Sequence, residues 1–233
     1  MGLRTIFFDA GNTLLFPDLG RTLAPLAAYS LRPTEAQLQA AECAAKEHRD
    51  RPESSSSKQV DQEYWQIYYT QLLERMGRND PCLCAALVAA TRVSANWSRV
   101  RPGSRDVLQR LRRRYRLGVI SNSDGQVSAS FRQVGLEDCF DSFTDSALVG
   151  YEKPHPGIFQ AALHSLAARP EESLYVGDIY SVDYLGALGA GMHAILMDPA
   201  GAYRDAGLPR IESLQELERQ LAAAGNLPGG SSP

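Results

Sequence analysis

Two carboxylate motifs stand directly behind apolar runs of this chain. Asp9-Ala10-Gly11-Asn12-Thr13 follows the run Leu3–Phe8, and Gly177-Asp178, with Asp183 five residues further on, follows Leu174–Val176. Such runs are typical of buried strands, and open α/β sheets build their sites at the carboxyl ends of these strands. We therefore expect Asp9, Asp178 and Asp183 to gather at one edge of a sheet.

Two further polar motifs lie between these carboxylates. Ser121-Asn122 comes directly after the run Leu117–Ile120, and Lys153 lies in the segment Glu152-Lys153-Pro154-His155-Pro156. Each motif again stands just beyond a strand-like run or in the loop that follows one. Acid, hydroxyl, amine and acid in this order predict a binding site for an anion together with a divalent metal.

Strand-like runs recur along the chain, and helical stretches separate most of them. The strands are expected at Leu3–Phe8, Leu117–Ile120, Phe140–Thr144, Leu174–Val176 and His193–Met197. The helices are expected near Ser104–Tyr115, Gln126–Val134, Pro156–Ala167, Val182–Ala190 and Ser213–Ala224. This alternation predicts an α/β fold with a mainly parallel, Rossmann-like sheet that helices cover on both faces.

Residues 17–97 break the alternation, because they contain no convincing strand. Helical stretches are expected there near Leu19–Ser30, Thr34–Arg49, Gln59–Met76 and Pro81–Asn96, with a turn at Pro52–Ser57. A segment of about eighty residues is too long for an ordinary crossover and predicts an inserted helical cap with hinges near Phe16–Asp18 and Ser98–Pro102. We predict a core of residues 1–16 and 98–226, a cap of 17–97 and a loose tail of 227–233.

Several residues carry local structural signals. Ser104 and Asp124 are expected to cap the helices that follow them. Asn12 can adopt the positive φ that a turn after Asp9 would need, since asparagine tolerates this conformation. Aromatic residues of the third helical stretch could line a pocket below the cap or pack the helical bundle itself; they are Tyr64, Trp65, Tyr68 and Tyr69.

Composition excludes several classes of partner. The net charge of −3 favours neither nucleic acid nor an anionic membrane, and the cluster Arg110–Arg114 is interpreted as a solvated helix face. No apolar run approaches the roughly 20 residues that span a bilayer, and the N-terminus does not resemble a signal peptide. The four cysteines show no zinc or redox spacing. We expect a cytoplasmic protein without nucleic-acid or membrane partners, as a monomer or homodimer.

The four motifs and the insertion together resemble one family. In order and spacing, over nearly the whole chain, the sequence is similar to the haloacid dehalogenase-like hydrolase superfamily, in its branch with a helical cap inserted after the first motif. Members of this superfamily include phosphatases, phosphonatases, phosphomutases and dehalogenases. The resemblance implies the fold more strongly than the reaction, because one fold serves many reactions.

The resemblance assigns a role to each acidic motif. Asp9 would be the nucleophile, forming an intermediate that water later cleaves. Mg²⁺ would be the cofactor, with Asp9, the backbone carbonyl of Gly11 and Asp178 as protein ligands, since Mg²⁺ prefers carboxylates, waters and substrate oxygens. Asp183 completes the expected metal site, where it would hold a metal-bound water or orient Lys153.

The remaining motifs would bind the substrate. Lys153 would pair with Asp9 and neutralise the transferred group as a point charge. Thr13 and Ser121 would donate their hydroxyls to phosphate, and Asn122 would donate a backbone N–H. The expected partner is accordingly a small anionic molecule.

Gly11 departs from the pattern of the family's phosphatases. These enzymes carry an aspartate two residues after the nucleophile, which protonates the leaving oxygen and later helps to activate water. Such acid–base assistance is typically worth ~10²–10⁴ in rate, and glycine can supply none of it. The rate of hydrolysis should fall most for alkyl phosphates, which have poor leaving groups.

Three interpretations remain open. The first is a Mg²⁺-dependent phosphohydrolase of weak or unusual activity. The second is hydrolysis of a carbon–halogen or carbon–phosphorus bond: phosphonatases have a small residue at this place and use a cap lysine as a Schiff base, and the cap lysines here are Lys46 and Lys58. The third is a catalytically feeble homologue that binds a ligand or a protein partner.

Overall fold

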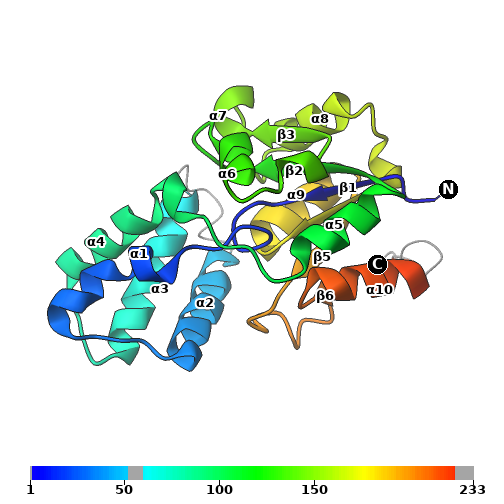
Figure 1. Cartoon of the computed structure of the whole chain (residues 1–233). Coiled ribbons are helices and arrows are strands. Elements are labelled where there is room, and N and C mark those ends of the chain that lie inside the picture. Colours follow the sequence, from blue (N-terminus) through cyan, green and yellow to red (C-terminus); the bar gives the residue numbers. More distant parts are fainter. Residues whose placement is uncertain (1, 52–59, 224–233) are drawn as a thin grey trace.

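The computed structural model describes residues 2–51 and 60–223, and it confirms the parallel sheet. Six parallel strands lie in the order β3-β2-β1-β4-β5-β6 (Figure 1). They are β1 (Thr5–Phe8), β2 (Arg116–Ser121), β3 (Ser142–Asp145), β4 (Ser173–Gly177), β5 (His193–Met197) and β6 (Arg210–Ile211). The sequence did not predict β6, because a strand of two residues is too short to form a recognisable apolar run.

Helices cover both faces of the sheet, as the alternation predicted. Ile6 and Phe8 of β1 face a cluster built with α5 (Ser104–Arg112), α6 (Val127–Gln133) and α10 (Leu214–Ala223). Phe7 points to the opposite face and packs with α8 (Pro156–Ser165) and α9 (Leu185–Gly189). Because successive side chains of a strand alternate between faces, β1 is buried on both sides and lies fixed at the centre of the sheet.

The segment between β1 and β2 is helical and has its own apolar cluster. It comprises α1 (Leu19–Thr22), the 3₁₀ turn η1 (Ala24–Tyr29), α2 (Glu35–Arg49), α3 (Val60–Arg75), α4 (Pro81–Thr91) and the 3₁₀ turn η3 (Ser94–Asn96). Figure 1 shows these helices as a group beside the sheet. The expected helix Leu19–Ser30 is interrupted at Leu23, and the expected turn Pro52–Ser57 lies outside the described residues, as do 224–226 of the predicted core and the whole predicted tail.

Two kinds of contact join this helical group, which we call the cap, to the sheet. Phe16 and Arg99 exchange backbone hydrogen bonds of 2.8 and 3.0 Å, so the two connecting segments run side by side near the predicted hinges. At the end of α2, the Asp50 carboxylate accepts hydrogen bonds from the Ser181 N–H at 2.9 Å and the Tyr203 hydroxyl at 2.8 Å. Helix α2 is therefore docked on the loops that follow β4 and β5. The division into core and cap domains itself stays a prediction.

Two of the local predictions were wrong. Gly103, in a left-handed conformation, caps α5, and Ser104 is already the first helical residue. Gln126 caps α6, while Asp124 accepts a hydrogen bond of 2.6 Å from the hydroxyl of Ser94 in the cap. Asn12 does adopt a positive φ of 54°. Among the described residues, no helix combines the length and the apolar character needed to cross a bilayer.

Candidate active site

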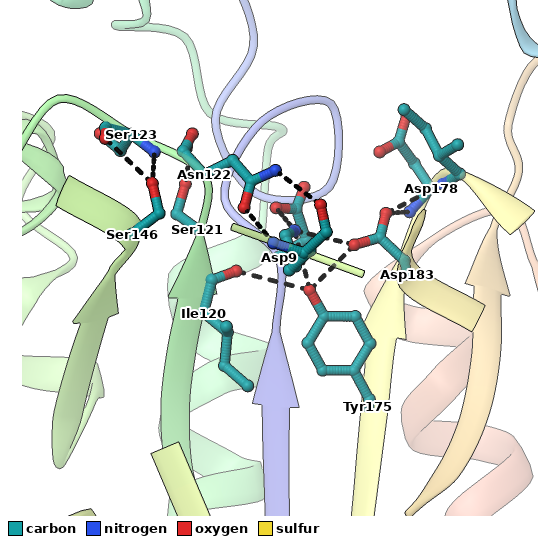
Figure 2. A network of polar contacts seen from close by, with 11 residues as sticks. Asp9, Ile120, Ser121, Asn122, Ser123, Ser146, Tyr175, Asp178 and Asp183 are labelled. Atoms are coloured by element: carbon teal, nitrogen blue, oxygen red, sulfur yellow. Dashed lines mark hydrogen bonds and ion pairs between the residues drawn. The ribbon is translucent and has the colours of Figure 1, made fainter. Parts of the chain in front are cut away.

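The site lies where the three central strands end. Asp9 follows β1 directly, Ser121 is the last residue of β2, and Asp178 follows β4 directly. The parallel register pairs Phe8 with both Val119 and Val176, so these strand ends meet at one edge of the sheet. Figure 2 shows Asp9 at the tip of β1, with Ser121 on one side and Asp178 and Asp183 on the other.

Lys153 lies buried between two carboxylates. Its Nζ donates hydrogen bonds to Asp9 Oδ1 at 2.5 Å and to Asp183 Oδ1 at 2.8 Å, and it lies 3.0 Å from the Tyr175 hydroxyl. Asn122 fixes the lysine backbone, because its Oδ1 accepts from the Lys153 N–H at 2.7 Å and its Nδ2 donates to the Lys153 carbonyl at 3.2 Å. The side chain of Asn122 thus has a positioning role that the sequence did not reveal.

Both carboxylate oxygens of Asp183 are engaged in hydrogen bonds. Oδ1 accepts from Lys153 and from the Tyr175 hydroxyl, while Oδ2 accepts from the N–H groups of Asp178 and Ile179 at 3.1 and 3.0 Å. Gly177 makes this approach possible, because a Cβ there would lie 2.5 Å from the Asp183 side chain. Asp183 therefore ties Lys153 to the loop that carries Asp178.

Three carboxylates gather at this edge of the sheet. Asp9, Asp178 and Asp183 are all buried, and each offers an oxygen within 4.8 Å of the others. Burial raises the pKa of Asp9 to about 7, although Lys153 opposes this shift. Burial likewise raises the pKa of Asp178 to about 8, against the influence of Lys46. The three carboxylates face Lys153 and Lys46, and Lys46 also pairs with Glu42, so full ionisation would leave negative charge uncompensated.

Lys46 is the second of these lysines, and the cap supplies it. Its side chain on α2 is fully buried, with Nζ 3.2 Å from Asp178 Oδ2 and 2.9 Å from Glu42 Oε1. Burial lowers its pKa, but Asp178 and Glu42 outweigh burial and hold the pKa of Lys46 well above its usual value. Nothing in the sequence pattern distinguishes Lys46, because Glu42 and Lys46 are spaced as an ordinary solvated i,i+4 ion pair.

The predicted phosphate-binding hydroxyls lie near the same strand ends. The Thr13 side chain is buried, and its Oγ1 has no hydrogen-bond partner among the described residues. A buried hydroxyl without a partner is costly, so it marks a place where a ligand atom could bind. The Ser121 hydroxyl makes a 3.5 Å contact with the Asn122 carbonyl. Ser121 lines the cavity beside Asp9 and can donate to an anion there, whereas Thr13 is not among the residues that line it.

A cavity of about 390 Å³ opens between the strand ends and the cap. Its core side, which we call the floor, contains Asp9, Ser121, Asn122, Lys153, Asp178 and Asp183. Its cap side, which we call the wall, contains Tyr64, Trp65, Thr91, Arg92, Ser94 and Trp97. Both interpretations of the cap aromatics hold in part, because Tyr68 and Tyr69 pack within the helical bundle while Tyr64 and Trp65 also line the cavity.

Trp97 covers Gly11, the position that departs from the phosphatase pattern. A Cβ on Gly11 would lie 3.2 Å from the indole ring of Trp97. The indole is anchored by its N–H, which donates to the Thr91 carbonyl at 2.8 Å. A longer side chain at position 11 would therefore require the ring to move. The sequence did not predict this contact, because Trp97 lies at the far end of the cap segment.

The comparison with known families agrees with this geometry. The profile of the haloacid dehalogenase-like hydrolase family matches residues 3–191, which include the cap and every predicted site residue. The chain belongs to the haloacid dehalogenase-like hydrolases. It is thus a hydrolase, and its Rossmann-like sheet is the fold of this family.

Relatives of this hydrolase cover it only in part. The chain is 35% identical over 145 residues to haloacid dehalogenase-like hydrolase domain-containing protein 3 of Bos taurus, covering 59% of this chain and 56% of that protein. It is 42% identical over 85 residues to a glyceraldehyde 3-phosphate phosphatase of Methanothermobacter thermautotrophicus, covering 36% of this chain and 38% of that protein. The hydrolase spans about half the length of these curated relatives, or less.

A solved structure of the same superfamily covers nearly the whole chain. The hydrolase YfnB of Bacillus subtilis, whose structure was solved with bound magnesium, matches with a TM-score of 0.67 over 94% of this chain and 98% of that one. The two sequences are 20% identical. At this identity the likeness shows a shared fold, and it does not assign a reaction to this hydrolase.

Proposed function

We propose that this hydrolase is a Mg²⁺-dependent phosphohydrolase that acts through a phosphorylated Asp9. The observation that carries the proposal is the pairing of Asp9 with Lys153 at 2.5 Å on the floor of the cavity. An ionised carboxylate held beside an ammonium can approach a phosphate, because the lysine offsets the repulsion between the two anions. Relatives named as phosphatases support this choice of reaction.

The proposed reaction has two steps. Asp9 attacks phosphorus, the ester bond breaks, and the leaving oxygen takes the bonding electrons with it. Water then attacks the acyl phosphate, which releases inorganic phosphate and restores the Asp9 carboxylate. Lys153 stabilises the charge of the transferred group, and the hydroxyl of Ser121 donates to its oxygens. The substrate is a small phosphorylated molecule that the cavity can enclose.

The donor atoms of the floor fit a magnesium ion. Asp9 and Asp178 supply carboxylates and Gly11 a backbone carbonyl, an all-oxygen set of the kind that Mg²⁺ prefers. Asp178 Oδ2 is buried with Lys46 as its ion-pair partner at 3.2 Å, and the three acids outnumber the two lysines. The ion would supply the positive charge that draws the phosphate to Asp9. Asp183, whose oxygens already accept four hydrogen bonds, would position Lys153 and Asp178.

Cleavage of a carbon–phosphorus bond is the second candidate. Lys46 favours it, because this buried cap lysine lies beside Asp178, where a Schiff base could form. The raised pKa of Lys46 counts against this reaction, since Schiff-base chemistry needs a neutral amine. Borohydride reduction in the presence of a phosphonate aldehyde would trap such a base on Lys46, and no trapped adduct is expected.

Fluoroberyllate tests the proposal without a leaving group. It bonds to a carboxylate as a mimic of aspartyl phosphate, and we expect fluorine NMR to show a bound species at millimolar Mg²⁺. The species should disappear in Asp9→Asn and after chelation of the metal, and it should weaken in Asp178→Asn. Glu171→Gln, an exposed substitution far from the floor, is the matched control. The absence of any bound species in the native protein would overturn the proposal in favour of a ligand-binding homologue.

A further inference from the structure

The wall of the cavity is aromatic. The rings of Trp65 and Trp97 meet edge to face with centroids 5.7 Å apart, and Tyr64 and Trp65 are likewise in edge contact at 5.0 Å. All three line the cavity opposite the floor. The hydrogen bond from the Trp97 indole to Thr91 fixes the orientation of that ring. A substrate with its phosphate on the floor therefore meets two indoles and a phenol with the rest of its structure.

A phosphate bound on the floor would have its leaving group on the side of the cavity that the wall lines. In phosphoryl transfer the attacking and leaving oxygens lie roughly in line, so a leaving group faces away from Asp9. Trp97 covers Gly11, the position at which the family's phosphatases carry their acid, with its ring 3.2 Å from where a Cβ would lie. The indole cannot serve as a proton donor for an alkoxide, because it is engaged with the Thr91 carbonyl.

The polar groups around the cavity are poorly suited to protonate a leaving group. The Tyr64 hydroxyl is buried without a hydrogen-bond partner among the described residues, and burial raises its pKa well above its usual value, which makes it a much weaker acid than a carboxyl group. Both oxygens of Asp183 accept hydrogen bonds, and Asp124 accepts one from Ser94. The guanidinium of Arg92 does not release a proton in proteins. Glu152 is the remaining carboxylate on the rim, and a variant must test it.

We propose that the natural substrate is a phosphate ester whose leaving group is planar and weakly basic, such as a phenol or an enol. This inference rests on the proposed phosphohydrolase function. Phenols have a pKa near 10, whereas water, which alcohols resemble, has a pKa of about 15.7. A phenolate can leave without a proton, and its ring can pack against Trp97 and Trp65. The aromatic wall would thus favour planar leaving groups and provide the surface on which they bind.

A series of leaving groups tests the inference on the purified protein with Mg²⁺. The substrates are 4-nitrophenyl phosphate, phenyl phosphate, ethyl phosphate and acetyl phosphate, the last being a good leaving group without a ring. We expect kcat/KM to fall from nitrophenyl to phenyl, and to fall by about 10²–10⁴ for ethyl, the range that a missing acid would cost. The same dependence should persist in Glu152→Gln.

Variants of Trp97 separate ring contact from leaving-group chemistry. Trp97→Leu should raise KM for the two aryl esters by roughly 3- to 10-fold, as expected for a lost aromatic contact, and leave KM for acetyl phosphate unchanged. Trp97→Phe keeps a ring and should restore most of the aryl affinity; it also guards against a folding defect in the leucine variant. Circular dichroism and fluoroberyllate capture are measured on each protein.

The outcomes distinguish this inference from the function on which it rests. Ethyl phosphate hydrolysed within about tenfold of phenyl phosphate, with fluoroberyllate still captured at Asp9, would overturn the substrate class and leave the phosphohydrolase standing. An equal rise of KM for aryl esters and acetyl phosphate in Trp97→Leu would overturn the ring contact. Failure of fluoroberyllate capture in the native protein would overturn both proposals together.

Discussion

The floor of the cavity and the cap each contain a buried lysine, but the two lysines are held by different partners. Lys153 on the floor lies between Asp9 and Asp183 and is fixed further by Tyr175 and by the side chain of Asn122. Lys46 reaches Asp178 from helix α2 of the cap at 3.2 Å, and its other partner, Glu42, lies on the same helix. The floor lysine belongs to a network within the sheet, whereas the cap lysine links two separately packed parts.

This difference suggests different consequences for function. A network tied to strand ends keeps its geometry as long as the sheet is folded. A contact between cap and core depends on how the two parts meet, so a cation arriving at Asp178 competes with Lys46 for the same oxygen. Four sets of substitutions can break or sharpen this comparison, and they follow in order of decreasing effect.

Removing the floor lysine should have the largest effect. Lys153→Met leaves Asp9 and Asp183 without their shared cation, and breaking a buried pair in this way costs about 3–5 kcal/mol of unfolding free energy. We expect kcat for 4-nitrophenyl phosphate to fall at least 10²–10³-fold, comparable to losing a transition-state donor. Urea unfolding and steady-state kinetics measure the two losses. Activity within tenfold of the native protein would remove Lys153 from the reaction.

Removing the cap lysine should strengthen the binding of Mg²⁺. Lys46→Met takes away a positive charge beside Asp178, so we expect Mg²⁺ to bind about tenfold more tightly in a calorimetric titration. The melting temperature without metal should fall, because Asp178 is left unpaired, and added Mg²⁺ should restore it. Lys46→Arg, which retains the charge, is the control. Weaker binding in Lys46→Met would show that the lysine supports the metal site instead of competing with it.

The effect of an acid at position 11 on the rate of hydrolysis should depend on Trp97 of the wall. Gly11→Asp alone must push the Trp97 ring away from a contact of 3.2 Å, and we expect no gain on ethyl phosphate. Combined with Trp97→Ala, the new carboxylate has room, and hydrolysis of ethyl phosphate should rise by about tenfold, a small part of what such acids contribute. Trp97→Ala alone is the matched control. A gain in the single Gly11→Asp variant would show that the indole does not block this position.

Two tyrosine substitutions should give the smallest and most closely matched effects. Tyr175→Phe on the floor removes a hydroxyl that contacts Lys153 and Asp183 at 3.0 Å, and Tyr69→Phe in the cap removes one that lies 2.5 Å from Thr91 Oγ1. Each should cost about 1 kcal/mol of unfolding free energy. Only Tyr175→Phe should lower kcat, by roughly 3- to 10-fold. Equal kcat values in the two variants would place Tyr175 outside the reaction.

The positions of the floor residues could be predicted from the sequence because the strands before them have a clear apolar pattern. Apolar runs mark β1, β2 and β4, and the carboxyl ends of parallel strands meet at one edge of the sheet. Asp9, Ser121 and Asp178 had to come together once these runs formed strands. Short elements escaped prediction for the converse reason: β6 and the helix α7 (Ser146–Val149) contain too few residues for a periodic pattern.

The contacts between the cap and the strand ends could not be predicted in this way. Helical periodicity shows which face of a helix is apolar, but not which neighbouring part that face will meet. Lys46 has the spacing of a solvated ion pair with Glu42 and is nevertheless fully buried. From the sequence, Trp97 is only an aromatic residue near a predicted hinge. Its position over Gly11 depends on how the cap folds back onto the strand ends.

The sequence by itself therefore determined the parallel sheet, the helical insertion and the order in which the floor residues arrive at the strand ends. Those features follow from local hydrophobic patterns and from the geometry of parallel strands. Only the tertiary structure decided that a cap lysine faces Asp178 and that an indole covers Gly11. Both contacts join side chains far apart in the chain, and their formation depends on the packing of two apolar clusters against each other, which no local pattern encodes.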